Sequence, residues 1–255
     1  MRRNAVVSGI ALVLVLSLMA VPGRAAEAAR PERIVDLRET IPDVLLDIRY
    51  HGPHNFVGAP VDGYRAAKCL ITREAAEALG KVQAELREFS LSLKIYDCYR
   101  PQRAVDHFVR WAEAIGDRKT QQEFYPTVDK RHLFRDGYIA KRSGHSRAST
   151  VDLTIVPLPP PPQERYRPGQ PLAACFLPAG QRFGDNSLDM GTGFDCFHEL
   201  SHPGNPRVGL TQRINRLLLK TLMDKHGFAG YDKEWWHFTL RDEPYPDTFF
   251  DFPVE

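Results

Sequence analysis

The fold is decided by residues 143–156, which read SGHSRASTVDLTIV. In the second half of this stretch, apolar residues at positions 151, 153 and 155 alternate with polar residues at 152 and 154, a pattern that predicts a β-strand. Asp152 lies on the face of that strand opposite the apolar side chains, so we expect its carboxylate to point at a cleft. His145, seven residues earlier, places an imidazole close to the same strand.

A second stretch, EWWHF at residues 234–238, carries the other half of the pattern. Its aromatic residues favour extended structure. On a regular strand Glu234 and His237 would lie on opposite faces, so a twist or bulge is required to bring both side chains to one site. With His145 and Asp152, the stretch offers two imidazoles and a carboxylate, which can hold a divalent metal and leave one position open for water. Glu234 suits the general base that such a water needs.

Both stretches resemble signatures of the zinc D-alanyl-D-alanine dipeptidases and their D,D-carboxypeptidase relatives. Residues 143–152 are similar to the family's Ser-x-His-x(6)-Asp motif, and residues 234–237 are similar to its Glu-x-x-His motif. Further matches to the dipeptidase branch follow in order over residues 33–255: VDGY at 61–64, DCYRP at 97–101, SGHSR at 143–147, FD at 194–195, LRDEPYP at 240–246 and FFDFPV at 249–254. Two small residues beside the metal motif depart from the family, because Ala148 replaces a usual glycine and Thr150 a usual alanine.

The resemblance implies a metal site with its catalytic partners. His145, Asp152 and His237 are expected to bind one Zn²⁺ per chain. Glu234 is expected to take a proton from water and pass it to the leaving amine, and Arg100 is expected to stabilise the tetrahedral oxyanion. Without the resemblance, Arg100 would be interpreted as a member of a surface ion pair.

The resemblance also implies a substrate and the residues that bind it. Asp195 and Tyr50 are expected to meet the ammonium group of a small dipeptide, and Ser143 to form a hydrogen bond near the site. The implied reaction is hydrolysis of D-Ala-D-Ala to two D-alanines, in cell-wall precursor metabolism or recycling. Two alternatives stay open: a D,D-carboxypeptidase or endopeptidase that acts on longer peptidoglycan stems, and a zinc-containing binding protein without turnover. The presence of Glu234 and Arg100 counts against the second alternative.

Residues 198–202, HELSH, also fit the H-E-x-x-H zinc motif, which works only on a helix. Glycines at 191 and 193 precede this segment, and Pro203, Gly204 and Pro206 follow it, so barely two helical turns would fit. We therefore predict a loop and a coincidental match.

The first 26 residues predict a secretory signal peptide. Arg2 and Arg3 precede an apolar run over residues 5–20, and cleavage is expected after Ala26 or Ala28. An uncleaved membrane anchor is the alternative, because the run is close to the lower length limit for spanning. We expect an exported protein, periplasmic or secreted, without stable membrane association after cleavage.

Removal of residues 1–26 takes away three arginines and no acidic residue, so the formal net charge changes from +2 to −1. A nearly neutral protein has no electrostatic reason to bind nucleic acid. Residues 27–255 are of a suitable length for one domain, expected to be the zinc D,D-dipeptidase domain. The oligomeric state does not follow from the sequence.

Residues 157–162, PLPPPP, should form stiff polyproline II and open an irregular segment, 157–188, which we call the proline-rich insertion. The insertion is longer than the dipeptidases lead us to expect. It is either a surface loop or a lid beside the cleft. Because a dipeptidase must close around both ends of its substrate, we expect the insertion to wall the cleft together with residues 50–64 and 189–195.

Four cysteines in an exported chain predict two disulfides, for which three pairings are possible. Cys69 precedes an expected helix and Cys98 ends the strand after it, whereas Cys175 and Cys196 are associated with the proline-rich insertion. Pairing Cys69 with Cys98 and Cys175 with Cys196 closes two compact loops. Free buried thiols are the alternative.

Apolar periodicity predicts three helices and a further strand. The helical stripes comprise Ala75, Leu79, Val82, Leu86 and Phe89; Ala104, Phe108, Trp111, Ala112 and Ile115; and Leu210, Ile214, Leu217 and Leu218, with Gly227 ending the third helix. Residues 91–95 alternate as a strand that delivers Asp97 to Arg100 at its end. Helices and strands do not alternate strictly, so we predict an α+β single domain with a small, mainly antiparallel sheet flanked by helices.

Overall fold

The computed structural model describes residues 28–255, so the expected signal peptide lies outside the described part of the chain. The strands are β1 (Ile34–Asp36), β2 (Leu45–Leu46), β3 (Leu70–Thr72), β4 (Leu91–Asp97), β5 (Thr150–Pro157), β6 (Phe228–Tyr231) and β7 (Glu234–Leu240). The helices are α1 (Arg73–Arg87), α2 (Gln102–Glu113), α3 (Gln121–Phe124) and α4 (Leu210–Lys225). A long irregular segment joins β5 to α4.

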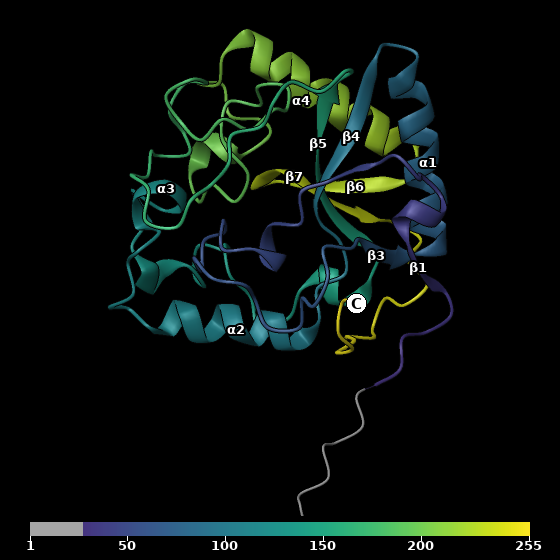
Figure 1. Ribbon diagram of the computed structural model, residues 1–255, viewed down its shortest axis with the longest axis horizontal. Helices are drawn as coiled ribbons and strands as arrows, with labels where there is room; N and C mark the ends of the chain where they lie inside the picture. Colours follow the sequence, from purple (N-terminus) through teal and green to yellow (C-terminus); the bar gives the residue numbers. More distant parts are fainter. Residues whose placement is uncertain (1–27) are drawn as a thin grey trace, which may run out of the picture.

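A five-stranded sheet in the order β2-β4-β5-β7-β6 organises the fold (Figure 1). β2 pairs with β4 in parallel, and the other three pairings are antiparallel. β1 and β3 form a separate antiparallel pair. The predicted α+β class with a small, mainly antiparallel sheet is confirmed.

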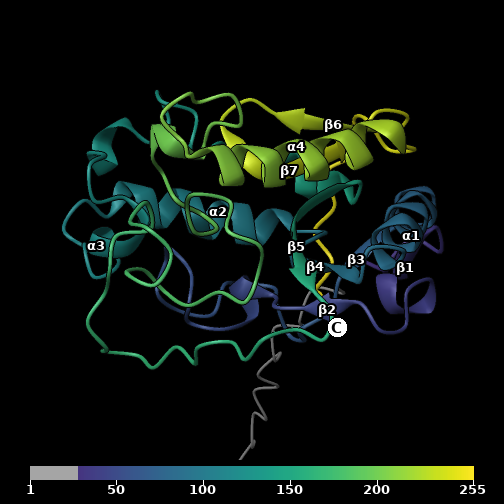
Figure 2. The ribbon, with the colours of Figure 1, turned by 90° about the horizontal axis from the view of Figure 1, so that it is seen from above.

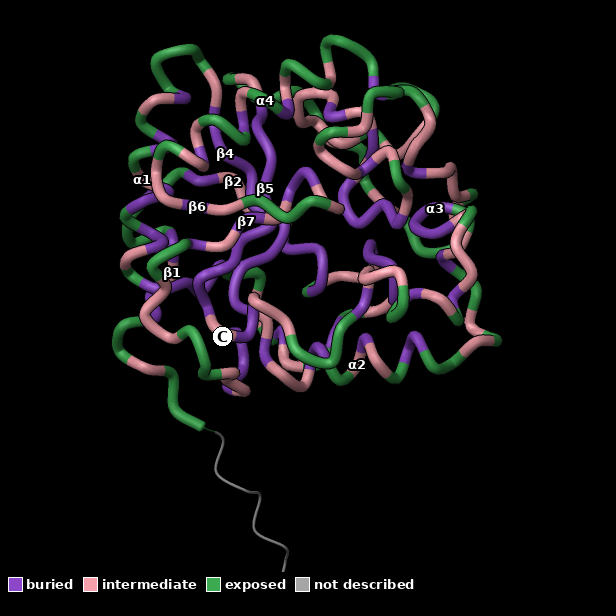
Figure 3. Tube along the Cα trace, turned by 180° about the vertical axis from the view of Figure 1, so that it is seen from behind, coloured by how far each residue is buried: buried purple, intermediate pink, exposed green. Residues whose placement is uncertain are grey.

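The middle strands form the buried centre of the molecule (Figure 3). Every residue of β5 from Thr150 to Val156 is buried, the polar positions included. α1 packs against β4, α4 packs against β6 and β7, and these two helices touch each other. Figure 2 shows α1 and α2 on opposite sides of β4 and β5. α2 and irregular segments therefore lie on the side of β4 and β5 away from α1.

The first two predicted helices form, with corrections at their ends. The apolar residues predicted to face the core from position 75 to 86 are buried in α1. Phe89 was wrongly included, since it lies beyond the helix and is 72% exposed. The chain turns away there because Ser90 adopts a left-handed φ of 54°. In α2 the predicted stripe is buried, but Ile115 lies beyond the helix end at Glu113.

The apolar face predicted for α4 was wrong at three of its four positions, because only Leu218 packs against the core. Leu210, Ile214 and Leu217 are 72%, 56% and 62% exposed, whereas Leu219 and Met223 are buried. The predicted stop at Gly227 is confirmed, with a φ of 90° just after the helix.

A buried arginine explains the orientation of α4. Arg216 donates to the carbonyl oxygens of Met190, Leu200 and His202 at 2.7–2.9 Å. These carbonyls belong to the irregular segment before the helix, where few backbone groups pair in a regular ladder, although the His202 carbonyl also accepts the Asn205 backbone N–H at 3.1 Å. Turning Arg216 inward therefore turns the neighbouring apolar stripe outward.

Both predicted disulfides are present. Cys69 pairs with Cys98 at a Cα–Cα distance of 5.1 Å, and Cys175 pairs with Cys196 at 5.5 Å. From residue 28 onward, no helix has the length and apolar character needed to cross a membrane.

Candidate active site

Two neighbouring strands bring the predicted metal ligands together. In the register of β5 and β7, Asp152 lies directly opposite His237. The pairing of β6 with β7 shifts register at Tyr231, which lies opposite Glu234. This irregularity lets Glu234 and His237 share one site, with Glu234 Oε2 3.5 Å from His237 Nδ1. It is the bulge that the alternation along the sequence requires but does not reveal.

His145 comes from a 3₁₀ turn, Gly144–Arg147, directly before β5. Ala148 follows that turn with a left-handed φ of 60°, a conformation that glycine adopts most readily. His145 Nδ1 is 2.7 Å from the Cys98 carbonyl oxygen, which can only accept, so this nitrogen carries the proton. Burial lowers the pKa of His145 to about 4 and keeps the ring neutral. Its Nε2 lone pair is therefore available to a metal.

Three donor groups converge on one point. One ligand atom each from His145, Asp152 and His237 lies within 4.8 Å of the others. His145 Nε2 is 3.3 Å from Asp152 Oδ2 and 3.3 Å from His237 Nδ1. Asp152 Oδ1 is buried without a well-formed hydrogen bond, although His237 Nδ1 is 3.1 Å away.

The charge state of the cluster fits a divalent cation. Burial alone would raise the pKa of Asp152, but His145 and His237 lower it below its usual range, so this carboxylate is ionised. An ionised carboxylate with one unsatisfied oxygen would be costly to bury alone. Two nitrogen donors and one oxygen donor form the three-ligand set that zinc enzymes use.

Glu234 provides a proton acceptor beside this cluster. It lines the same pocket as Asp152 and His237. Burial raises the pKa of the Glu234 carboxyl to about 7, while His237 opposes the rise and Asp152 adds to it. A carboxylate with this pKa can accept and release a proton near neutral pH.

Arg100 reaches the site from the loop after β4. Its Nε donates to Asp97 Oδ2 at 2.9 Å, and its Nη2 lies 3.4 Å from Asp152 Oδ2. The Arg100 side chain is only 11% exposed, so the interpretation as a surface ion pair was wrong. Burial alone would lower the pKa of Arg100, but Tyr50, Asp97 and other neighbours raise it well above its ordinary value. The guanidinium is thus a fixed positive charge in the pocket.

Asp195 and Tyr50, both expected to meet the substrate ammonium, contact each other. The Tyr50 hydroxyl donates to Asp195 Oδ2 at 2.9 Å, and both residues are buried and line the pocket. Burial raises the pKa of Asp195 well above its usual range, and the charge of Asp152 adds to the rise. Ser143 also lines the pocket, although its Oγ accepts a hydrogen bond from the His145 backbone N–H at 3.3 Å.

One cavity of about 290 Å³ is lined by seven of the residues described above: Tyr50, Arg100, Ser143, Asp152, Asp195, Glu234 and His237. Sequence reasoning missed several of its lining residues, whose separate positions along the chain give no shared signal: Val105, Phe108, Tyr138, Ile139, Arg142, Phe197 and Tyr231. Tyr50, Phe56 and Asp195 come from the two segments expected to wall the cleft. The expectation for the proline-rich insertion was wrong, because none of the lining residues belongs to 157–188.

The H-E-x-x-H segment is the predicted loop. Its central residues form a single 3₁₀ turn, Glu199–Ser201. His198 Nδ1 accepts the backbone N–H of Leu200 at 3.0 Å and so caps that turn. Neither histidine of the segment joins the metal cluster found within residues 28–255.

The fold and the cluster together define a metallopeptidase-like site, and comparison with known proteins gives the family. The chain belongs to the D-Ala-D-Ala dipeptidase family, peptidase family M15, whose model matches residues 30–158 and 183–255. It is 39% identical over 216 residues to the D-alanyl-D-alanine dipeptidase of Streptomyces coelicolor, covering 85% of this chain and 95% of the relative. The Enterococcus faecium dipeptidase is 36% identical over 219 residues, covering 86% and 96%, and the Escherichia coli K12 dipeptidase is 33% identical over 207 residues, covering 81% and 84%.

Proposed function

We propose that this protein is a zinc-dependent dipeptidase that hydrolyses D-Ala-D-Ala to two D-alanines. The observation that carries the proposal is the convergence of His145, Asp152 and His237 on one point, beside a pocket that Asp152, His237 and Glu234 line. Membership of a family named for this activity, over most of the chain, supports the same substrate.

His145, Asp152 and His237 would hold one Zn²⁺, because they offer two imidazole nitrogens and one oxygen of an ionised carboxylate as ligands. A bound zinc ion supplies Lewis acidity, which polarises a peptide carbonyl and makes water more acidic. The Cys98 carbonyl fixes the tautomer of His145 through the 2.7 Å contact with Nδ1.

Glu234 and Arg100 perform the proton transfer and charge stabilisation. Glu234 takes a proton from the attacking water and delivers it to the leaving amine, for which its pKa of about 7 is suited. Arg100, held by Asp97, donates to the oxyanion that develops on the scissile carbonyl. Removal of one such donor typically costs about 3–4 kcal/mol of transition-state stabilisation.

Each end of the dipeptide is paired with a side chain of opposite charge in the pocket. The buried Asp195 carboxylate, with the Tyr50 hydroxyl, binds the substrate ammonium. Arg142, next to Ser143, also lines the pocket, with its guanidinium 5.0 Å from the Phe249 ring, and offers a positive charge to the substrate carboxylate. If Arg142 has this role, Arg142→Ala should raise KM for D-Ala-D-Ala but leave KM for D-Ala-D-alaninamide unchanged.

One assay tests the proposed function directly. The purified zinc-loaded protein is incubated with D-Ala-D-Ala and, separately, with a pentapeptide stem that ends in D-Ala-D-Ala, and free D-alanine is quantified. We expect release from the dipeptide and little from the stem. Preferential release from the stem would assign the protein to the carboxypeptidases, and no release from either substrate would leave a zinc-containing binding protein.

We also propose that the protein acts outside the cytoplasm on a small dipeptide, without nucleic acid or stable membrane association. The charged, apolar and small-residue order of residues 1–26 supports export. The two disulfides support an oxidising compartment, where such bonds persist. Mass spectrometry of the mature N-terminus after cell fractionation tests both the cleavage after Ala26 or Ala28 and the location.

A further inference from the structure

The proline-rich insertion is firmly anchored, although it contributes nothing to the lining of the pocket. The buried Lys94 ammonium donates to Gln163 at 2.6 Å and to Asp185 at 2.9 Å, so both ends of the insertion meet one charge. Between them, Tyr166 stacks on His54 with ring centroids 4.3 Å apart. The family model omits residues 159–182, so most of the insertion lies outside the segments that match the family.

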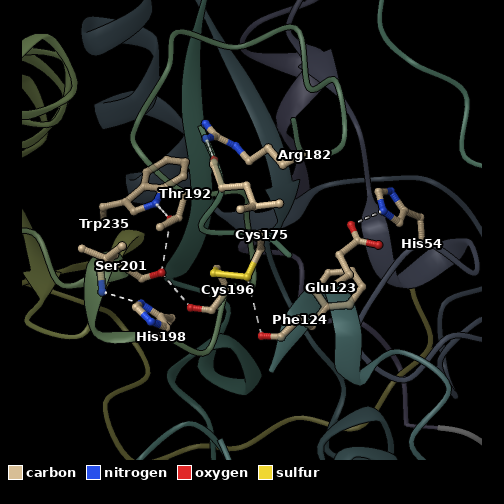
Figure 4. Close-up of a disulfide and its surroundings, with 12 residues drawn as sticks. His54, Glu123, Phe124, Cys175, Arg182, Thr192, Cys196, His198, Ser201 and Trp235 are labelled. Carbon is tan, nitrogen blue, oxygen red and sulfur yellow. Dashed lines mark hydrogen bonds and ion pairs between the residues drawn. A yellow bond between two sulfur atoms is a disulfide. The ribbon is translucent and has the colours of Figure 1, made fainter. Parts of the chain in front are cut away.

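Cys175 joins this insertion to the chain on both sides of Asp195, and Figure 4 shows its disulfide to Cys196. Its carbonyl oxygen accepts the Gly193 backbone N–H at 2.8 Å, two residues before Asp195. Its sulfur forms the disulfide with Cys196, the next residue after Asp195. The Cys175 backbone N–H in turn donates to the Glu123 carbonyl oxygen at 3.0 Å, so Cys175 is also attached to α3. We call the links from Cys175 to Gly193 and Cys196 the clamp.

Asp195 needs such a clamp because its backbone is in the left-handed region, with a φ of 56°. Residues other than glycine adopt this conformation mainly where their surroundings impose it. Its carboxylate points at the pocket in this conformation and accepts the Tyr50 hydroxyl. A change in the backbone at Asp195 would therefore move the carboxylate away from Tyr50 and from the substrate.

The clamp also reaches the strand that carries Glu234. The Cys196 carbonyl oxygen accepts the Ser201 hydroxyl at 2.7 Å, and Ser201 lies 3.2 Å from the Thr192 hydroxyl. Thr192 in turn accepts the indole N–H of Trp235 at 2.8 Å, beside Glu234 (Figure 4). The clamp and β7 therefore share one buried hydrogen-bond chain.

From these contacts we infer that the Cys175–Cys196 disulfide and the proline-rich insertion act as a positioning device for Asp195, which sets the affinity for the ammonium end of the substrate. The inference rests on the proposed function, in which Asp195 binds that ammonium group. It assigns the insertion a role behind the pocket wall and makes substrate affinity dependent on an oxidised disulfide.

The test compares two substrates in the variant Cys175→Ala/Cys196→Ala. D-Ala-D-Ala carries the ammonium group, and N-propionyl-D-alanine has the same shape without it. We expect KM for D-Ala-D-Ala to rise about tenfold with kcat changed by less than about threefold, and kcat/KM for N-propionyl-D-alanine to stay the same. The ratio of the two kcat/KM values is independent of the fraction of folded protein, so a loss of stability alone does not change it.

The variant Cys69→Ala/Cys98→Ala is the matched control, because it also removes one disulfide. The Cys98 carbonyl contacts His145 and no part of this pair lies beside Asp195, so activity on both substrates should change together. If the first variant does not fold, wild-type protein in which the Cys175–Cys196 bond is reduced and alkylated after folding gives the same measurement. An unchanged substrate ratio with the bond absent would overturn the inference, whereas failure of the wild type to cleave D-Ala-D-Ala would overturn the proposed function instead.

Discussion

Removal of the substrate ammonium should slow cleavage at least a hundredfold. Asp195 is 5% exposed, and among the described residues the hydrogen bond that its side chain accepts comes from the Tyr50 hydroxyl. Leaving one partner of a buried ion pair without the other typically costs about 3–5 kcal/mol. Burial raises the pKa of Asp195 well above its usual range, so the carboxyl can take up a proton when no ammonium is present. The expected loss of binding free energy is therefore at the lower end of that range. A loss of about 3 kcal/mol corresponds to slightly more than a hundredfold in kcat/KM.

Two analogues separate charge from size in this prediction. N-acetyl-D-Ala-D-Ala removes the charge and adds bulk, whereas N-propionyl-D-alanine removes the charge alone. Both should be cleaved at least about a hundredfold more slowly than D-Ala-D-Ala, as measured by D-alanine release. Asp195→Asn should reduce the difference in kcat/KM between D-Ala-D-Ala and the two analogues, mainly because KM for D-Ala-D-Ala rises. Comparable rates on D-Ala-D-Ala and its N-acetyl form would refute both the ammonium role of Asp195 and the dipeptidase assignment, in favour of a carboxypeptidase.

Three further predictions concern the base, the metal and the buried histidine. Glu234→Gln should lower kcat by about 10²–10⁴-fold with one zinc retained per chain, as measured by steady-state kinetics and metal analysis, and near-wild-type turnover with zinc bound would contradict the assignment. Chelation should lower the melting temperature, because a metal held by His145, Asp152 and His237 binds the folded chain and stabilises it, and zinc should restore it; no shift would mean that the cluster binds no metal. Burial lowers the pKa of His54, so the unfolded chain binds its proton more readily than the folded one. The free energy of unfolding should therefore fall as the pH drops below about 6.5, and urea titrations of His54→Gln should show a shallower fall.

The sequence indicates the chemistry of the site better than its geometry. Alternation around Asp152 predicts a strand and the face of its carboxylate, because the period of a strand is a local property. The register that places Asp152 opposite His237 is set by pairing between segments far apart in the chain. The irregularity at Tyr231 depends on how β6 meets β7, and no residue between 234 and 238 marks it.

The error in α4 has a similar physical origin. Leu210, Ile214 and Leu217 recur with helical spacing, so the pattern favours them as the buried face. The spacing of apolar residues contains no information about the carbonyl groups of the irregular segment, which need hydrogen-bond donors from the helix. Arg216 satisfies three of them and is buried in their place. A periodicity argument thus fails where a polar requirement outside the helix decides its orientation.

The sequence predicts both disulfides, but it does not predict their roles, which depend on what lies next to each bond in the fold. Cys98 lies between Asp97 and Tyr99, and its carbonyl oxygen accepts from His145. Cys196 directly follows Asp195. Each disulfide is therefore attached next to a different half of the site, the first beside a metal ligand and the second beside the proposed ammonium site. Loss of the Cys69–Cys98 bond should weaken metal binding, whereas loss of the Cys175–Cys196 bond should raise KM. The even number of cysteines and the short loops that they close do not predict this difference.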